Sequence, residues 1–332
     1  MAGPPPAVAA LRLAVRRCLA PLPAGLVLVA CSGGADSLAL ASAAAWVGAR
    51  TGRAIGLVTV DHGLQPGSAD RAAQVVAWAG TAGLTPAVVA AVAIDPADPL
   101  GPEAAARNAR YQALRHHSQE YASTAVLLGH TVDDQAETVL LALARGAGPR
   151  GLSGMPERRT VDGLTLLRPF LGERRATTRA YCVEAGLSPW DDPHNADPRY
   201  ARARVRADLL PALVDTLGDG VVGNLARTAG QIAADSAYLD ELASAAADDC
   251  RSGDGLDVHR LADLPAALRT RVLHAWALGL GAEPAALGHR HVAAMAALVV
   301  DWHGQGPTML PGAIVVTRAG GRLTGRAAPP PG

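Results

Sequence analysis

The segment Ser32-Gly33-Gly34-Ala35-Asp36-Ser37 constrains this chain more than any other part of its sequence. An apolar run, residues 25–31, precedes it, and an Ala/Leu-rich stretch, residues 38–50, follows it. This order predicts a strand, a tight glycine turn and the start of a helix. Such a turn points free backbone N–H groups and the positive end of the helix at one place, which creates an anion site.

The residue types in this loop suit a phosphate chain. Gly33 and Gly34 allow positive φ and a close approach of ligand to backbone, and the flanking serines offer hydroxyl donors. A phosphate would repel Asp36 unless a cation lay between them, and Mg²⁺ prefers carboxylate and phosphate oxygens. We therefore predict a pyrophosphate cradle with Mg²⁺ near Asp36. The plain structural alternative is a Gly-Gly turn before a Ser or Asp helix cap.

Two common glycine-rich nucleotide motifs do not fit this loop. No Gly-Lys-Ser/Thr follows the glycines, and their spacing differs from that of the dinucleotide fingerprint. The chain contains no lysine, so all 30 of its basic residues are arginines. Contacts to phosphate must therefore come from arginine or from the backbone, and catalysis by a lysine side chain is excluded.

Apolar runs and helical patterns alternate regularly over the first 145 residues. The predicted strands are residues 25–31, 55–60, 86–94 and 124–129. The predicted helices are residues 7–20, 36–49, 68–82, 102–121 and 132–144. Nearly continuous apolar strands separated by helices predict an α/β fold with a parallel, Rossmann-like sheet that is covered on both faces.

Polar clusters follow three of these strands. The loop 32–37 follows the first, Asp61-His62-Gly63-Leu64 follows the second, and Gly129-His130-Thr131-Val132-Asp133-Asp134 follows the fourth. Ligands of parallel sheets bind at the carboxyl ends of the strands. We therefore expect the three clusters to converge on one site.

The length of 332 residues suggests about two domains. We expect a catalytic domain over residues 1–215 and a smaller, mainly helical domain over residues 216–332. A Gly/Pro/Arg-rich loop with a hairpin around Asp162-Gly163 is predicted within residues 145–172, and a helix over 173–185. A long helix, residues 226–248, links the two domains, and short strand-like pieces occupy residues 308–323.

Acidic residues open the helix predicted at 132–144. Carboxylates in a first helical turn usually cap the helix or complement its dipole. That explanation accounts for one or two acids, but Asp134 and Glu137 also share a helical face beside the phosphate site. Paired carboxylates there would bind a cation or the amine of a substrate.

Arginines gather in two places. Arg107 and Arg110 lie three residues apart on one helical face, which is also typical of a solvated surface. The second group combines four arginines with one tyrosine: Arg199, Tyr200, Arg202, Arg204 and Arg206. This pattern suits phosphate contacts and base stacking with a folded RNA, although an exposed helix face is the competing interpretation.

Cysteine spacing and composition disfavour several kinds of site and several classes of protein. The four cysteines, Cys18, Cys31, Cys182 and Cys250, are far apart without a C-x-x-C, which disfavours zinc, iron–sulfur and disulfide frameworks. The sequence shows no secretory signal and no apolar run long enough to span a membrane. We expect a soluble cytoplasmic protein without a membrane partner.

Taken together, the motifs resemble the tRNA(Ile)-lysidine synthetase family of the N-type ATP pyrophosphatase (PP-loop) superfamily. The Ser-Gly-Gly-x-Asp-Ser loop marks the superfamily. The family is marked by Asn108-Ala109-Arg110-Tyr111, by residues 128–138, by the glycine-rich residues 140–155, by Arg168-Pro169-Phe170-Leu171 and by residues 190–200. The resemblance covers residues 24–215.

This resemblance implies an ATP-dependent ligase. It would join L-lysine to the wobble cytidine of a tRNA(Ile) with anticodon CAU, through an adenylated cytidine. The implied ATP site comprises Ser32, Gly33, Gly34, Ala35, Asp36, Ser37, Asp61, His62, Gly129 and His130. Asp36 and Ser37 are the implied catalytic residues, and Asp36 the implied Mg²⁺ ligand.

The same resemblance implies sites for the other two substrates. The implied lysine pocket comprises Arg110, Asp134 and Glu137. The implied tRNA contacts are Arg199, Tyr200, Arg202, Arg204 and Arg206, and residues 216–332 would associate with the tRNA.

Some alternatives stay open at this level. A PP-loop tRNA thiolase would need the clustered cysteines that this sequence lacks, and a non-catalytic tRNA-binding protein would not need intact loop and acidic motifs. The oligomeric state is open, with a homodimer among the options, and so is the group that deprotonates the lysine amine.

Overall fold

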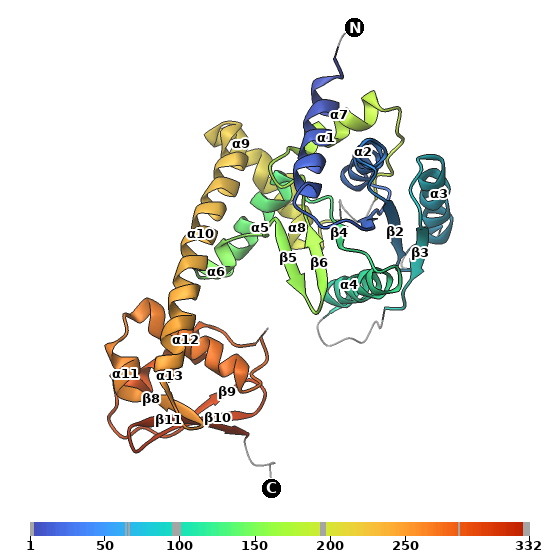
Figure 1. The fold of residues 1–332 in the computed structure, drawn as a ribbon. Helices are drawn as coiled ribbons and strands as arrows, with labels where there is room; N and C mark the ends of the chain where they lie inside the picture. The colour runs from blue at the N-terminus through green and yellow to red at the C-terminus, as the bar shows by residue number, and fades with distance from the viewer. Residues whose placement is uncertain are drawn as a thin grey trace. The chain divides into compact units, whose positions relative to one another are not determined.

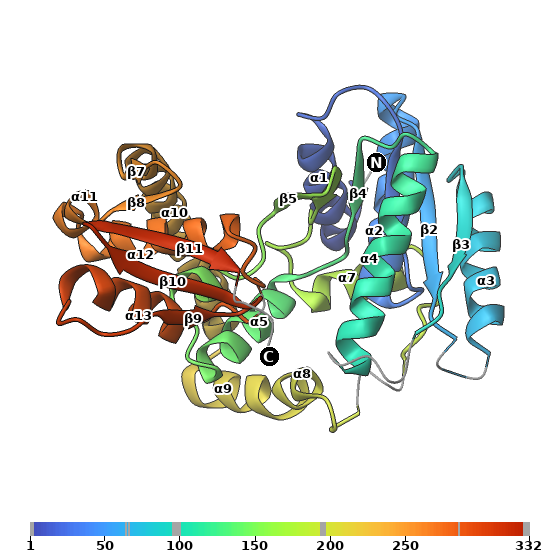
Figure 2. The same ribbon diagram turned by 90° about the horizontal axis from the view of Figure 1, so that it is seen from below.

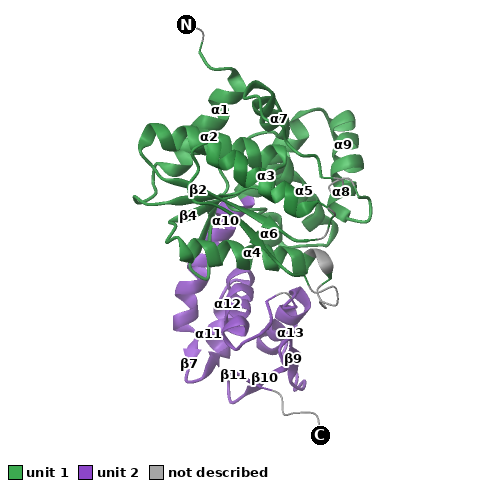
Figure 3. Cartoon of the chain, turned by 90° about the vertical axis from the view of Figure 1, so that its right-hand side faces the viewer, with its two compact units in different colours: residues 1–231 green, residues 232–332 purple. Residues whose placement is uncertain are grey.

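The computed structural model describes residues 3–63, 65, 67–94, 101–192, 197–284 and 286–327. The chain divides into two compact units, residues 1–231 and residues 232–332, which Figure 3 colours separately. No helix in the described ranges is long and apolar enough to cross a membrane.

Unit 1 is built on a six-stranded sheet with the order β3-β2-β1-β4-β6-β5 (Figures 1 and 2). Its strands are β1 (Val27–Ala30), β2 (Ile55–Asp61), β3 (Ala87–Ala91), β4 (Ala125–Leu127), β5 (Arg158–Val161) and β6 (Leu164–Leu167). All neighbouring strands are parallel except β5, which pairs antiparallel with β6. The predicted parallel α/β sheet is confirmed.

Helices cover both faces of this sheet. The helices of unit 1 include α1 (Pro6–Leu19), α2 (Ala35–Thr51), α3 (Ser68–Thr81), α4 (Pro102–Glu120), α5 (Val132–Ala144), α6 (Pro149–Leu152), α7 (Arg175–Glu184), α8 (Ala201–Arg204) and α9 (Leu210–Leu217). Of these, α1, α2, α3 and α7 pack in the core on one face of the sheet, and α4 packs in the core on the other. Val27 and Val29 point into the core shared with α1, α2 and α7, whereas Leu28 packs on the opposite face with Leu114 of α4. This alternation follows from the period of two along a strand.

The predicted hairpin around Asp162-Gly163 joins β5 to β6. Both residues have positive φ, +48° and +79°, as a two-residue type I′ turn requires. The turn lets β6 return antiparallel along β5, which is the edge strand, and the two strands extend the sheet beyond the four expected from the apolar runs.

Unit 2 contains helices and an antiparallel sheet. The long helix α10 (Gly220–Asp249) runs from unit 1 into unit 2, which also holds α11 (Val258–Asp263), α12 (Ala266–Gly279) and α13 (His289–Val300). The sheet has the order β7-β8-β11-β10-β9. Its strands are β7 (Arg251–Ser252), β8 (Gly255–Asp257), β9 (Thr308–Leu310), β10 (Ile314–Ala319) and β11 (Arg322–Ala327). Leu261, Leu273 and Met295 are fully buried between these layers.

The division between the units lies within α10. The sequence placed the boundary at residues 215/216, whereas the compact units meet at residues 231/232. The reason is packing: Val222 in the first turns of α10 is buried against Val132, Val205 and Leu210 of unit 1.

Phe170 offers a test of the unit 1 core. It is the only phenylalanine of the chain and is fully buried. Phe170→Ala should lower the free energy of unfolding by about 3–5 kcal/mol, because it leaves a cavity in a close-packed core. Urea unfolding followed by circular dichroism would measure this. Leu143→Ala, at a side chain 59% exposed, is the control and should change stability by less than about 0.5 kcal/mol. Equal effects of the two substitutions would contradict the packing.

Candidate active site

A cavity of about 670 Å³ opens at the carboxyl edge of the parallel strands. Its walls come from the loop 32–37 after β1, from residues 58–63 at the end of β2, and from residues 128–130 after β4. Side chains of α7 and of the segment 202–206 complete it. The geometry thus brings together the three polar clusters that follow β1, β2 and β4, all within unit 1.

The hydroxyl of Ser37 holds the loop 32–37 in shape. It accepts a hydrogen bond from the backbone N–H of Ser32 at 3.1 Å and donates one to the carbonyl oxygen of Gly34 at 3.0 Å. Gly33 has a φ of +84°, which disfavours any residue with a side chain. Gly34 caps α2, so the helix begins at Ala35 directly after the turn.

Gly129 lets β4 approach the loop closely. A Cβ atom at this position would lie 3.0 Å from the carbonyl carbon and oxygen of Asp36 and 3.1 Å from the Cα of Ser37. These are backbone atoms at the start of a helix and cannot move aside cheaply. The predicted ATP-site residue Gly129 is therefore a spacing requirement of the cavity.

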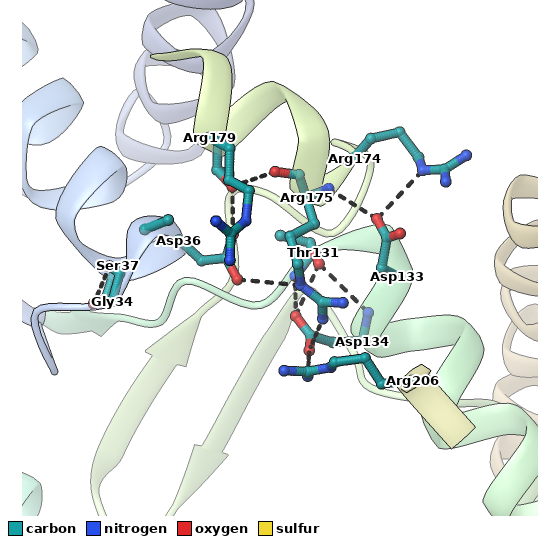
Figure 4. Close-up of polar contacts among 12 residues, drawn as sticks. Gly34, Asp36, Ser37, Thr131, Asp133, Asp134, Arg174, Arg175, Arg179 and Arg206 are labelled. Atoms are coloured by element: carbon teal, nitrogen blue, oxygen red, sulfur yellow. Dashed lines mark hydrogen bonds and ion pairs between the residues drawn. The ribbon is translucent and has the colours of Figure 1, made fainter. Parts of the chain in front are cut away.

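The carboxylate of Asp36 lies at the inner end of the loop, with 26% of its side chain exposed. It accepts a hydrogen bond from the hydroxyl of Thr178, and its Oδ2 is 3.6 Å from Nε of Arg175 (Figure 4). Burial raises the pKa of Asp36, and the charge of Asp134 adds to the shift, although Thr178 and Arg175 act against it.

Asp134 both caps α5 and pairs with cationic groups, which are the two roles that the sequence allowed. One carboxylate oxygen, Oδ2, accepts from the backbone N–H of Thr131 at 2.8 Å and completes a capping box at the start of α5. The other, Oδ1, accepts from Nη2 of Arg175 at 2.8 Å and from Nη2 of Arg206 at 3.1 Å (Figure 4). Burial by itself would raise the pKa of Asp134, but Arg175 and the Thr131 N–H outweigh it and lower this pKa.

Glu137 is fully buried beside Asp134 and is held by the same two arginines. Arg206 donates to it twice, from Nε at 2.8 Å and from Nη2 at 3.1 Å, and Arg175 donates from Nη2 at 3.1 Å. A buried carboxylate requires such partners, because desolvation of an unpaired charge costs several kcal/mol. Nε of Arg202 also lies 3.9 Å from Oε2 of Glu137. The predicted pair of acids therefore shares one face of α5 and meets the guanidinium groups of Arg175 and Arg206.

The arginine-rich stretch divides into two groups. Arg202 and Arg206 turn inward, where Arg202 donates to the hydroxyl of Thr138 at 3.1 Å. Arg199 instead binds Asp197 and is 78% exposed, and Arg204 donates to the carbonyl oxygen of Pro198 at 2.6 Å. Tyr200 is the N-cap residue of α8.

A π-helical turn, η2 (Val205–Leu209), separates α8 from α9 and carries Arg206. Pro211 has no N–H to donate to the carbonyl four residues earlier, and the N–H of Leu210 bonds instead to the carbonyl of Val205, five residues back. The wider turn therefore occurs next to Arg206, one of the residues that line the cavity.

The opposite side of the cavity is cationic. Arg110 lines it, its Nε is buried without a hydrogen-bond partner among the described residues, and burial lowers its pKa. Burial also lowers the pKa of His62 and of His130, so both imidazoles are neutral at pH 7. Asp61, at the end of β2, accepts from the N–H of Gly63, and this hydrogen bond lowers its pKa.

Sequence reasoning missed the contribution of α7. Arg175 and Thr178 reach Asp36, and the backbone N–H of Arg175 donates to Asp133 Oδ2 at 2.8 Å. The available signal was the Arg174-Arg175 pair within residues 151–206, which carry 10 arginines against 7 acids. No local pattern in the sequence shows that Arg175 faces the loop after β1.

Comparison with known proteins decides the family. The PP-loop domain family matches residues 10–213, and the TilS substrate binding domain matches residues 256–324. The chain is 62% identical to the tRNA(Ile)-lysidine synthase of Salinispora arenicola, over 98% of each chain. The chain belongs to the tRNA(Ile)-lysidine synthase family. A lysidine synthase of Leifsonia xyli is 51% identical, over 91% of this chain and 90% of the relative.

A solved structure supports the fold of this lysidine synthase family member. The U34-tRNA thiolase NcsA from Methanococcus maripaludis, solved with its 4Fe–4S cluster, matches with a TM-score of 0.56 over 68% of this chain and 80% of that chain. Its sequence is only 17% identical, so the likeness concerns the fold. The four cysteines here are free and lie apart in the sequence.

The lowered pKa of Asp134 predicts how the stability of the folded protein changes with pH. Because the folded-state pKa of Asp134 is lowered, its contribution to stability is present above the unfolded value of about 3.9 and is lost as pH falls below it. Asp134→Asn should therefore cost on the order of 1–3 kcal/mol at pH 7, and the difference from wild type should shrink below about pH 4. Thermal unfolding in a pH series would measure it.

The exposed Asp219 provides the matched control for that experiment. Asp219→Asn should leave the stability curve within about 0.5 kcal/mol of wild type at every pH. A loss for Asp134→Asn that stayed constant down to pH 2 would show that the carboxylate charge does not carry the effect.

Proposed function

We propose that the protein ligates L-lysine to C2 of the wobble cytidine of a tRNA(Ile) with anticodon CAU, with ATP as the energy source. Two steps would be required: adenylation of the cytidine with release of pyrophosphate, then displacement of AMP by the lysine amine. The observation that carries this proposal is the 62% identity to a tRNA(Ile)-lysidine synthase over 98% of both chains. The geometry of the cavity supports a role for each group.

ATP would bind with its phosphates on the loop 32–37. The start of α2 offers backbone N–H groups and the positive end of its dipole, and the loop is held open by Ser37. Asp61, His62, Gly129 and His130 border the same cavity. Since the two imidazoles are neutral, they would contact the nucleotide as hydrogen-bonding groups and not as cations.

Asp36 fits a Mg²⁺ ligand. Mg²⁺ is usually held by one or two carboxylates, phosphate oxygens and water, and the partly exposed Asp36 borders the cavity at the phosphate loop. Burial raises its pKa despite the nearby Arg175, so the ion pair with Arg175 does not fully offset the desolvation of this carboxylate. When bound, Mg²⁺ would neutralise negative charge on the phosphates.

In the first step the C2 oxygen of the cytosine attacks the α-phosphorus of ATP. The bond to the bridging oxygen breaks, and its electron pair leaves with pyrophosphate. The base must first leave the anticodon stack to reach this atom. The loop N–H groups would stabilise the charge that develops on the phosphates.

In the second step the ε-amine of lysine attacks C2 and AMP leaves. Arg110 has a buried Nε without a partner and would take the lysine carboxylate, while Asp134 and Glu137 would accept the substrate ammonium. From the described residues, Asp134 already accepts four hydrogen bonds and Glu137 three. With about four acceptor sites on each carboxylate, the ammonium would take the place of an Arg175 or Arg206 donor at Asp134. The attacking amine has an ordinary pKa of about 10.4, so desolvation or a nearby carboxylate must lower it.

The tRNA would be held by two parts of the chain. Arg199, Tyr200 and Arg204 do not join the buried charge cluster, and their stretch would contact phosphates and stack on a base, with Arg202 and Arg206 closer to the reacting cytidine. Residues 216–332, which include the segment matched by a substrate binding domain, would hold the tRNA body. A homodimer and a cytoplasmic location remain predictions.

The function is tested by the complete reaction. Purified protein, ATP, ¹⁴C-lysine and a CAU-anticodon tRNA(Ile) transcript should give labelled tRNA, with AMP and pyrophosphate formed in equal amounts. A transcript with guanosine at the wobble position is the control and should stay unlabelled. Incorporation of sulfur from a sulfide donor, without lysine, would favour a thiolase. Tight tRNA binding without any turnover would favour a non-catalytic binding protein.

The role of Asp36 is tested by substitution. Asp36→Ala should abolish tRNA-dependent exchange of pyrophosphate into ATP, because the proposed cation ligand is removed. Its melting temperature should not fall, since the substitution removes a carboxylate whose raised pKa marks an unfavourable burial of charge. Exchange at the wild-type rate would refute the assignment. Asp70→Ala, in the first turn of α3, is the matched control.

A further inference from the structure

The side chain of Arg175 joins the phosphate loop to the acid pair. It begins α7, and its backbone N–H is fixed by Asp133 Oδ2 at 2.8 Å. Its side chain is 18% exposed and lines the cavity. One nitrogen, Nη2, is engaged by Asp134 and Glu137, as Figure 4 shows for Asp134.

Another nitrogen of Arg175 faces the carboxylate of Asp36 without a close hydrogen bond. Its Nε is buried, makes no hydrogen bond with any residue that the structure describes, and lies 3.6 Å from Oδ2 of Asp36. A buried N–H that makes no hydrogen bond costs about 1–3 kcal/mol, so the contact between Nε and Asp36 is only partly satisfied in the described structure. This donor lies next to the carboxylate at the inner end of the loop 32–37.

The ion pairs with Asp134 and Glu137 fix the position of Arg175, but Arg175 is not the only cation that compensates these two carboxylates. Arg206 already supplies two hydrogen bonds to Glu137 and one to Asp134. Arg175 adds the contact toward Asp36, which Arg206 does not make in the described structure. Because three carboxylates surround it, Arg175 is a permanently charged and immobilised guanidinium, and their charges raise its pKa although burial opposes this.

Because its side chain lines the cavity beside the phosphate loop, we propose that Arg175 is a further catalytic residue, whose guanidinium donates to a non-bridging oxygen of the α-phosphate of ATP during adenylation of the cytidine. The inference rests on the proposed function. When the C2 oxygen bonds to phosphorus and the bond to pyrophosphate breaks, negative charge accumulates on that group. A fixed cation at this place stabilises the transition state without any proton transfer, and Asp134 and Glu137 hold it in position.

The test separates adenylation from lysine transfer. Single-turnover release of pyrophosphate from ATP is measured with excess enzyme and the CAU-anticodon transcript, and without lysine. Arg175→Gln should slow this step by about 100-fold, the size expected for one lost donor at a developing charge. Arg175→Lys, which keeps the charge but not the fork of donors, should recover part of the rate.

Binding measurements keep the proposal falsifiable. The Kd of a non-hydrolysable ATP analogue and the Kd of the tRNA should change by less than about 3-fold in both variants, because the proposed contact strengthens in the transition state. A loss of affinity as large as the loss of rate would overturn the proposal and make Arg175 a binding residue. An unchanged rate in Arg175→Gln would overturn it as well.

Two further variants control for folding and for general charge. Arg174→Gln removes the neighbouring guanidinium, which is 44% exposed and pairs with Asp133, and should adenylate at the wild-type rate. An equal loss in this variant would refute a specific role for Arg175. If Arg175→Gln alone does not fold, the double variant Arg175→Gln/Asp134→Asn is used, and its rate of pyrophosphate release is compared with that of Asp134→Asn. If the wild-type protein itself releases no pyrophosphate with this tRNA, the proposed function fails, which is distinct from failure of the residue assignment.

Discussion

The structure of unit 1 depends on the burial of two carboxylates, Asp134 and Glu137, together with the guanidinium groups that meet them. A charge taken out of water costs several kcal/mol unless oppositely charged partners replace the lost hydration. Arg175 comes from α7 and Arg206 from η2, so the ion pairs tie three segments that are distant in sequence. The wall of the cavity is therefore defined by charge compensation as well as by apolar packing.

This compensation leaves the cavity electrostatically uneven. The acid pair is matched by Arg175 and Arg206, whereas Arg110 on the other side has a buried Nε without a hydrogen-bond partner among the described residues. Such an arrangement suits substrates that bring both anionic and cationic groups, as ATP and an amino acid do together. The absence of lysine makes every one of these contacts an arginine fork, which holds its direction better than a flexible amine.

The local elements were largely predictable. Apolar runs of period two or near-continuous character marked β1 to β4, and the Asp162-Gly163 turn marked the hairpin that adds β5 and β6. Only part of the antiparallel sheet of unit 2 was predictable from the sequence. Its strands are two to six residues long, and helices separate β8 from its partner β11 along the chain. The position of the unit boundary also depends on packing, since the first turns of α10 bury Val222 against α5 and η2.

By itself, the sequence determined the chemistry of the loop 32–37, the alternation of strands and helices, and the convergence of polar clusters after β1, β2 and β4. These properties follow from local patterns and from the direction of parallel strands. Only the tertiary structure decided that Arg175 and Arg206 would meet Asp134 and Glu137, while Arg199 would pair with Asp197 near the surface. Ion pairs between distant segments have no local signature, because any of 30 arginines could satisfy a buried carboxylate until the fold brings particular ones within reach.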